Sequence, residues 1–137
     1  VIMPVNDDDF YHSIDVIRYL EIHKKSVTIF ARDYKISLIP DKHKLRIMEH
    51  TAQDETKLGL PVKPLREKLS RLDYQVVVDL NRSENLFCSM AANLIHSRLR
   101  IGFTKPGADK YYNFHFTFDE PIAEISYKNF LNCLQMF

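Results

Sequence analysis

The sequence predicts an α/β protein built on an open, mostly parallel sheet with helices on both faces. Residues 74–81 are apolar and β-branched and end in a short polar residue, as expected for a strand that is buried on both faces. Residues 98–103 have the character of a shorter strand. Between these two runs, residues 83–97 have helical spacing, with Leu86, Met90 and Leu94 on one stripe. A strand, a helix and a strand in about thirty residues form a βαβ unit.

Size and composition are those of an ordinary globular protein, and we expect one domain over residues 1–137. The net charge of +1 gives no general reason to expect nucleic acid or an anionic membrane as a partner. No apolar run has the length of a membrane span, so we do not expect an integral membrane protein. Cys88 and Cys133 lie in apolar helical patterns and are expected to be buried thiols. These features favour a cytoplasmic location.

The N-terminal half predicts three strands and one long helix. Residues 1–5 read as the first strand, 26–31 as the second and 45–48 as the third. The acidic segment 6–9 suits the start of a helix over 10–23, whose buried stripe contains Phe10, Ile14 and Ile17. Residues 32–44 indicate a short helix or an irregular crossing. Residues 50–64 are polar, contain two prolines and a glycine, and predict a surface loop.

The C-terminal half supplies the remaining elements of the predicted sheet. A helix beginning near Pro64 leads into the strand at 74–81, and the βαβ unit follows. Residues 105–109 predict a turn, and aromatic and polar residues alternate over 111–118 as on an edge strand. The segment Asp119-Glu120-Pro121 ends that strand. A last helix is expected from its cap at Ser126.

Ligands of such sheets bind outside the carboxyl ends of the strands, which here carry residues 6–9, 32–33, 79–83 and 104–110. The cluster Asp7, Asp8 and Asp9 is the densest group of carboxylates, and His12 lies one helical turn beyond Asp9. One of these carboxylates could act as a general base or orient a hydroxyl. The cluster could instead cap the helix as a solvated acidic turn, which is the interpretation that we favour, and both interpretations stay open.

Asp79 lies near the end of the strand predicted over 74–81, which we take as the central strand. There it could face a ligand or cap the next helix. Arg82 could bind an anion or lie in solvent. The only glycines are Gly59, Gly102 and Gly107, so the chain contains neither a dinucleotide-binding nor a P-loop motif. The histidines show no metal-ligand spacing. We therefore expect neither a cofactor nor a metal.

Several of these motifs resemble the N-terminal half of the heptosyltransferase-like glycosyltransferases of family nine. The run 72–81, LDYQVVVDLN, and the later RIGF of 100–103 are similar to that family's YDLVIDLQG and RRIGF segments. The Asp9-Phe10-Tyr11-His12 turn and the helix after it resemble the family's GDVIHTLP start, and residues 27–32 resemble its second strand.

The resemblance implies a Rossmann-like domain, the acceptor-side half of a two-domain GT-B enzyme. It implies that Asp9 and His12 correspond to the family's catalytic aspartate and histidine, and it makes Asp8, Asp79, Asn81 and Arg82 candidate ligand-binding residues. Asp8 and Arg82 replace family glycines, and the serine-rich loop before the aspartate is absent. These departures fall where the family handles its ligands.

Three functions follow as hypotheses. The first is a glycosyltransferase-like domain without transferase activity of its own, serving as a binding or structural subunit with a protein partner or a second domain. The second is the half of an active heptosyltransferase-type enzyme that binds a sugar acceptor, with the donor half elsewhere. The third is a receiver-like or flavodoxin-like module, in which the acidic cluster and Asp79 would bind metal and phosphate and Thr104 and Lys105 would assist.

Overall fold

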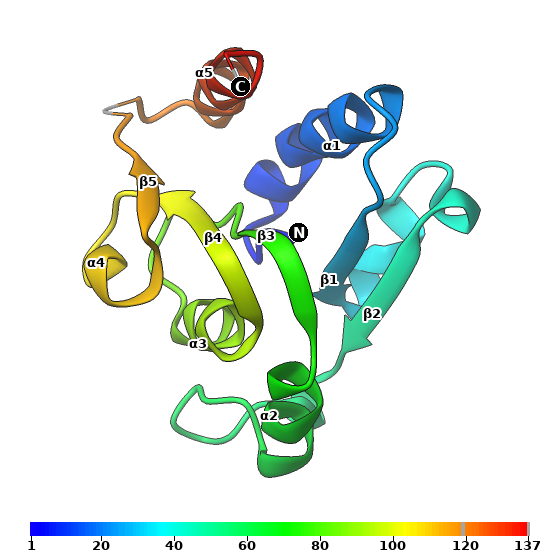
Figure 1. Cartoon of the computed structure of the whole chain (residues 1–137), viewed down its shortest axis with the longest axis vertical. Helices are drawn as coiled ribbons and strands as arrows, with labels where there is room; N and C mark the ends of the chain where they lie inside the picture. The colour runs from blue at the N-terminus through cyan, green and yellow to red at the C-terminus, as the bar shows by residue number, and fades with distance from the viewer. Residues whose placement is uncertain (119, 137) are drawn as a thin grey trace.

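The computed structural model describes residues 1–118 and 120–136. It confirms the predicted fold class, because parallel strands form a layer with helices on both of its faces (Figure 1). The strands are β1 (Thr28–Arg32), β2 (Arg46–His50), β3 (Asp73–Val78), β4 (His96–Phe103) and β5 (Phe114–Phe116). Each pairing between these strands is parallel.

The N-terminal segment joins two small sheets into one layer. Strands β1 and β2 form one sheet and β3, β4 and β5 form the other, and Ile2 makes a parallel bridge to each of them. The Ile2 backbone donates to the Val78 carbonyl at 2.7 Å, and the Met3 backbone donates to the Phe30 carbonyl at 2.9 Å. Counting this segment as a strand, the order is β2, β1, Ile2, β3, β4, β5. That is the strand order of the classic Rossmann fold rather than of flavodoxin.

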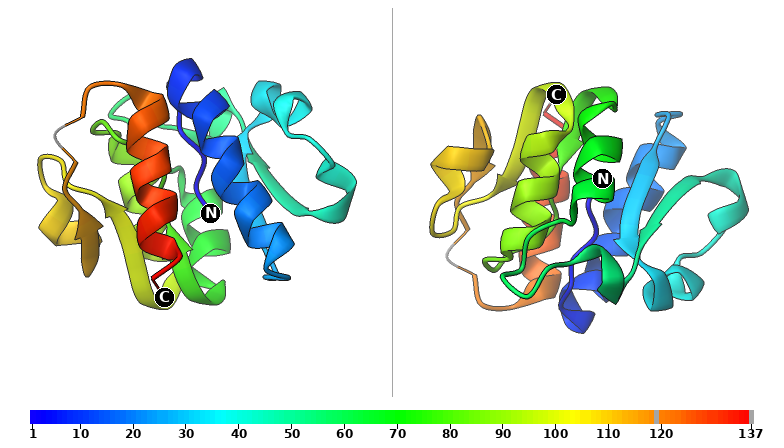
Figure 2. Two further views of the ribbon diagram at one scale, coloured as in Figure 1. Left: turned by 90° about the horizontal axis from the view of Figure 1, so that it is seen from above. Right: turned by 90° about the horizontal axis from the view of Figure 1, so that it is seen from below.

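Two pairs of helices cover the two faces of the layer. Helices α1 (Asp7–Ile22) and α5 (Ala123–Leu134) lie side by side on one face, and α2 (Lys63–Ser70) and α3 (Leu86–Leu94) lie on the other (Figure 2). Each pair encloses its own apolar cluster against the strands. The single turn α4 (Ala108–Tyr111) precedes β5. No helix among the described residues is long and apolar enough to cross a membrane.

Short 3-10 turns occupy the segments whose sequence predicts irregular structure. Residues 32–44 contain η1 (Asp33–Leu38) and η2 (Lys42–Lys44), and the predicted surface loop contains η3 (Ala52–Asp54). Helix α1 begins three residues earlier than predicted, because the Asn6 side chain caps it by accepting the Asp9 backbone N–H at 3.0 Å. The predicted N-terminal strand is reduced to the bridges made by Ile2.

Three local predictions are wrong. The central strand is not buried along its whole length, since the first four residues of β3 are exposed or half-buried and Val76 is 44% exposed. The strand predicted over 111–118 is limited to β5, because the turn of α4 takes up Tyr111. Ser126 does not cap α5: it is buried inside the helix, and its hydroxyl donates to the Glu120 carbonyl at 3.1 Å. The predicted strand break at Asp119 lies outside the described residues.

A tight contact fixes Tyr112 against β4. A Cβ atom added to Gly102 would lie 2.8 Å from the ring of Tyr112, which is itself 4% exposed. The substitution Gly102→Ala should therefore lower the free energy of unfolding by about 1–3 kcal/mol through overpacking. Urea unfolding measures this loss. The control Arg98→Ala changes an exposed side chain of the same strand and should stay within about 0.5 kcal/mol of the wild type. Equal stability of Gly102→Ala and the control would contradict the contact.

Candidate functional site

The carboxyl edge of the layer carries all of the sequence-predicted site residues. The order in which successive strands are added reverses there, because Ile2 connects through α1 to β1 on one side, whereas β3 connects through α3 to β4 on the other. Sheets of this kind bind ligands at such a switch point. Asp8, Asp9 and His12 reach the edge from the first turns of α1, and residues 79–82 follow β3 directly.

Asp79 is completely buried and lies at the centre of a closed network. Its Oδ1 accepts the backbone N–H of Asn81 at 3.0 Å and the side-chain amide of Asn81 at 2.7 Å. Its Oδ2 accepts the phenol hydroxyl of Tyr112 and lies 3.3 Å from the Lys105 ammonium. Burial and the charge of Asp79 raise the pKa of Tyr112 well above its usual range, so its hydroxyl stays a donor. This carboxylate is committed to partners within the chain.

Asn81 carries the network to the N-terminal segment. Its Oδ1 accepts the Val5 backbone N–H at 2.9 Å, and its amide donates to the Met3 carbonyl at 3.4 Å. Its own carbonyl accepts from Lys105 at 2.8 Å. Both the oxygen and the nitrogen of the Asn81 amide therefore form hydrogen bonds within the chain. The cap of α3 comes from Asn85, so Asp79 does not cap that helix.

Asp9 and Arg82 are brought together as a partly buried ion pair across 73 positions of sequence. The Arg82 Nε donates to Oδ1 of Asp9 at 2.9 Å, and Nη2 lies 2.8 Å from the same oxygen. The side chain of Asp9 is 5% exposed and that of Arg82 is 22% exposed. Arg82 also donates to the Glu120 carbonyl and the Ser126 hydroxyl, each at 3.2 Å. The pair thus links the start of α1 to the start of α5.

The other acidic residues of the cluster turn to separate partners. Asp7 lies 2.9 Å from the ammonium of Lys35, a buried lysine that also donates to the carbonyl of Val5. Asp8 is exposed, and its Oδ1 lies 3.5 Å from Nε2 of His12. The carboxylates therefore do not converge as the receiver-like hypothesis requires. The described part of the chain contains no group of three or more His, Cys, Asp or Glu residues placed to hold a metal ion.

A second buried cluster lies at the ends of β1 and β2. His50 is 4% exposed and stacks on Phe30 with ring centroids 4.5 Å apart. It is paired in register with Arg32, and within the described residues its Nδ1 and the Arg32 Nε have no hydrogen-bond partner. Burial, and then the charge of Arg32, lower the pKa of His50 to about 4. The ring is therefore neutral at neutral pH.

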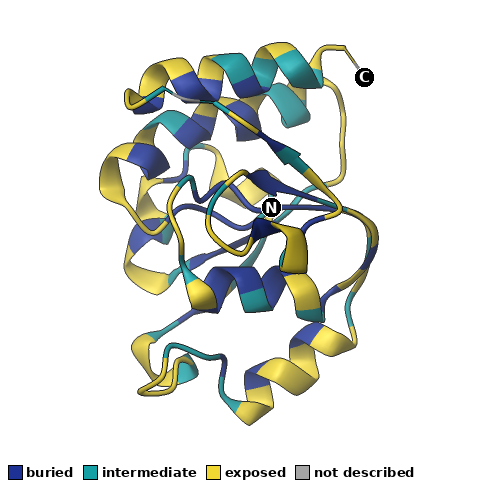
Figure 3. Cartoon of the chain, turned by 90° about the vertical axis from the view of Figure 1, so that its left-hand side faces the viewer, coloured by how far each residue is buried: buried dark blue, intermediate teal, exposed yellow. Residues whose placement is uncertain are grey.

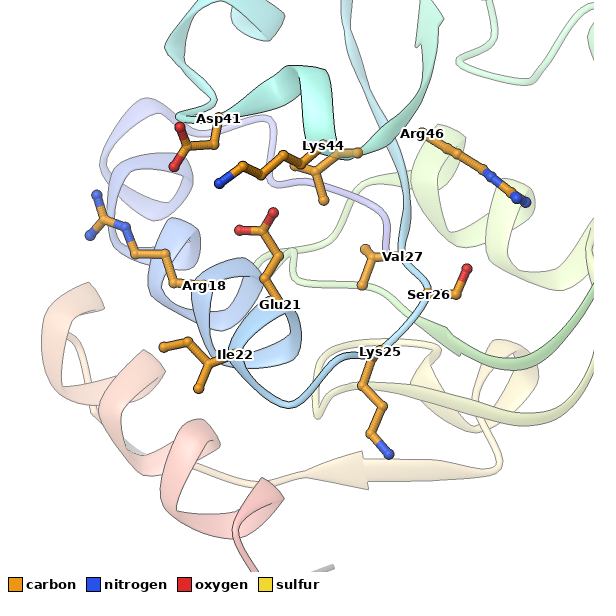
Figure 4. Close-up of a pocket in the computed structure, with 10 residues that line it drawn as sticks. Arg18, Glu21, Ile22, Lys25, Ser26, Val27, Asp41, Lys44 and Arg46 are labelled. Atoms are coloured by element: carbon orange, nitrogen blue, oxygen red, sulfur yellow. The ribbon is translucent and has the colours of Figure 1, made fainter.

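Two surface depressions lie away from these buried networks. One, of about 600 Å³, is at the amino ends of β1 and β2. There Arg18, Glu21, Asp41 and Lys44 approach one another, so cations and carboxylates are mixed (Figure 4). A second, of about 620 Å³, lies beside α1 and α5 and is lined by His12. Of the sequence-predicted site residues, only His12 lines either depression.

Sequence reasoning did not name Lys35, which comes from a segment predicted as irregular. It named Tyr112 only as one of the basic and aromatic residues near 105–112 and as part of the predicted edge strand, not as a partner of Asp79. The polar groups of both residues complete the networks. Lys105 did have a sequence signal, since the receiver-like hypothesis uses the lysine that follows β4, and the structure brings it to Asp79. His50 appeared only as one of several scattered histidines.

Comparison with known proteins gives no relative. No protein-family model matches the chain, and no match is found among curated proteins or among solved structures.

The Asp79–Lys105 pair can be tested by removing one charge. Asp79→Asn keeps the shape but leaves the buried ammonium uncompensated, and should cost about 3–5 kcal/mol of the free energy of unfolding. The double variant Asp79→Asn/Lys105→Met should recover part of this loss, as a double-mutant cycle by denaturant unfolding would show. Glu67→Gln, on exposed α2 surface, is the matched control. Additive losses in the double variant would contradict the pairing.

His50 makes stability depend on pH in a defined window. Its pKa is about 4 in the folded chain and 6.5 when unfolded, so only the unfolded chain binds a proton between these values. The contribution of His50 to the free energy of unfolding therefore has its full value above pH 6.5. It falls by about 3 kcal/mol as the pH is lowered to about 4, at roughly 1.4 kcal/mol per pH unit. The difference in stability between wild type and His50→Leu should change by this amount. His43→Leu, at an exposed position, should keep the wild-type slope.

Proposed function

We propose that this chain is a glycosyltransferase-like domain that has no transferase activity of its own and serves as a binding or structural subunit of a larger assembly. The observation that carries the proposal is the ion pair between Asp9 and Arg82. A general base must be free to accept a proton from its substrate. Asp9 is 5% exposed, and two guanidinium nitrogens lie within 2.9 Å of its Oδ1.

The rest of the carboxyl edge supports the same function. Asp79 and Asn81, which the resemblance makes candidate ligand-binding residues, hold each other and the N-terminal segment. Arg82 replaces a family glycine and supplies the guanidinium that occupies Asp9. One departure from the family pattern, Arg82, is therefore a side chain that helps to close the edge. A chain that keeps the fold and fills its ligand edge with internal contacts suits a role in assembly.

The alternative is the acceptor-binding half of an active heptosyltransferase-type enzyme whose donor half lies elsewhere. One observation favours it. The His12 side chain is 22% exposed and lines the depression beside α1 and α5, together with Tyr11 and Asp15. A sugar acceptor in this depression would meet an imidazole, a phenol and a carboxylate, which are suitable partners for hydroxyl groups. Such an enzyme would still have to release Asp9 from Arg82.

The first experiment is affinity purification of the tagged chain from the cells that make it, with mass spectrometry of the native particle. The proposal expects a stable complex with other subunits and no nucleotide-sugar turnover by that complex. Turnover that disappears with His12→Ala and Asp9→Asn would establish the alternative. A monomeric chain without turnover would contradict both functions.

The role of Asp9 is testable with a charge-neutral replacement of the pair. Asp9→Asn alone leaves a partly buried guanidinium unpaired and should cost about 1–3 kcal/mol of stability. Asp9→Asn/Arg82→Gln should recover part of this loss and keep the complex intact, because the carboxylate has no chemical role in the proposed function. Thermal unfolding and co-purification measure the two effects. The contrary result would be a wild-type complex that turns over a nucleotide-sugar and a double variant that is equally stable but inactive. That result would show that Asp9 is catalytic.

A further inference from the structure

Positive charge is concentrated in one short segment of this nearly neutral chain. Residues 56–72 contain five of the 19 Lys and Arg residues and one of the 18 Asp and Glu residues, which leaves 14 basic and 17 acidic residues elsewhere. The five cations are Lys57, Lys63, Arg66, Lys68 and Arg71. The net charge of +1 predicts no anionic surface as a partner, but it conceals a strong local asymmetry of charge.

These cations are exposed and unpaired. All five side chains lie in exposed positions. Lys57 is in the loop before α2, three are on the helix itself, and Arg71 is its C-cap residue. None forms an ion pair with any of the described residues, although other cations of the chain do. The buried face of α2 uses Leu65 and Leu69, so the charges take the remaining surface of the helix. Their field is consequently directed at solvent.

An apolar side chain projects beside the cations. Leu58 is 80% exposed, next to Lys57 at the tip of a tight turn. The turn is held by the Gly59 N–H, which donates to the Thr56 carbonyl at 3.0 Å, and by a positive φ of 79° at Gly59. The Thr56 hydroxyl also accepts the Leu60 N–H at 3.1 Å. This backbone keeps Leu58 on the outside, where exposure of a leucine has no benefit for folding.

The turn and α2 lie together at one end of the molecule. Figure 1 shows them at the end of the longest axis, opposite α1 and α5, and Figure 3 shows α2 mostly exposed at that end. A flat partner could therefore contact this end without touching the helices of the other face. We call residues 56–72 the basic tip.

We propose that the basic tip docks the protein on an anionic lipid membrane, with the five cations over the headgroups and Leu58 inserted among the acyl chains. Basic residues near an anionic leaflet add attraction one by one, and an inserted apolar side chain adds the second contribution that stable peripheral binding needs. Single-stranded nucleic acid fits less well, because residues 56–72 contain no aromatic side chain on which bases could stack.

The test is co-sedimentation of the full chain with vesicles of phosphatidylcholine containing roughly 30% phosphatidylserine, a composition typical of anionic surfaces. The proposal expects binding to these vesicles, little binding to pure phosphatidylcholine, and loss of binding in high salt. Lys63→Glu/Arg66→Glu/Arg71→Glu should weaken binding at least about 100-fold. Leu58→Ser should weaken it about tenfold without changing the charge.

A matched charge reversal away from the tip serves as the control. Lys25→Glu/Lys42→Glu/Lys110→Glu changes the net charge equally at three exposed positions and should reduce binding much less. Circular dichroism verifies that every variant is folded. Equal loss in the two triple variants would reduce the effect to net charge and overturn the proposal. Failure to bind anionic vesicles, with tip-dependent binding to an oligonucleotide, would assign the surface to nucleic acid instead.

Discussion

One buried carboxylate determines how the carboxyl edge of this protein is built. Asp79 has no contact with solvent, so its charge requires a cation and hydrogen-bond donors inside the fold. Lys105 supplies the cation from the end of β4, and Asn81 supplies two donors. Because Asn81 also binds the backbone of Val5, the same interaction holds the N-terminal segment beside β3. Removing the carboxylate would leave a buried ammonium and a loosened central bridge together.

The architecture could be predicted from the sequence because it depends on local periodicity. Apolar runs with period two and stripes with period 3.6 mark elements whose type is insensitive to their neighbours. The predictions that failed concern burial and side-chain contacts, which depend on residues distant in the sequence. Val76 has the pattern of a buried residue but is 44% exposed, and Ser126 has the chemistry of a cap but lies inside α5 and accepts a hydrogen bond from Arg82. Coverage of a strand is decided by the lengths and positions of distant helices, which no local window contains.

The candidate site was predictable in place but not in chemistry. Since the carboxyl ends of parallel strands share an edge, Asp9, Asp79 and Arg82 could be assigned to one region from the sequence. The sequence does not encode, in any short pattern, that Arg82 would neutralise Asp9 or that Lys35 would reach Asp7. These pairs depend on side-chain directions across long sequence separations. The structure therefore changes how these residues are interpreted. Groups that resembled catalytic and binding residues contact one another instead.

The bridges made by Ile2 impose an order on folding. β3 and β4 pair across 23 positions of sequence, from Asp73 to His96, whereas Ile2 must wait for Val78 and Leu80. Closing the longer loop costs about 1 kcal/mol more in chain entropy. During synthesis, the segment that begins the chain therefore stays unpaired on that side until β3 has left the ribosome, and it enters the sheet as a late, central strand. Until Ile2 pairs with both sheets, β1 on one side and β3 on the other keep open edges, which are sites for mispairing.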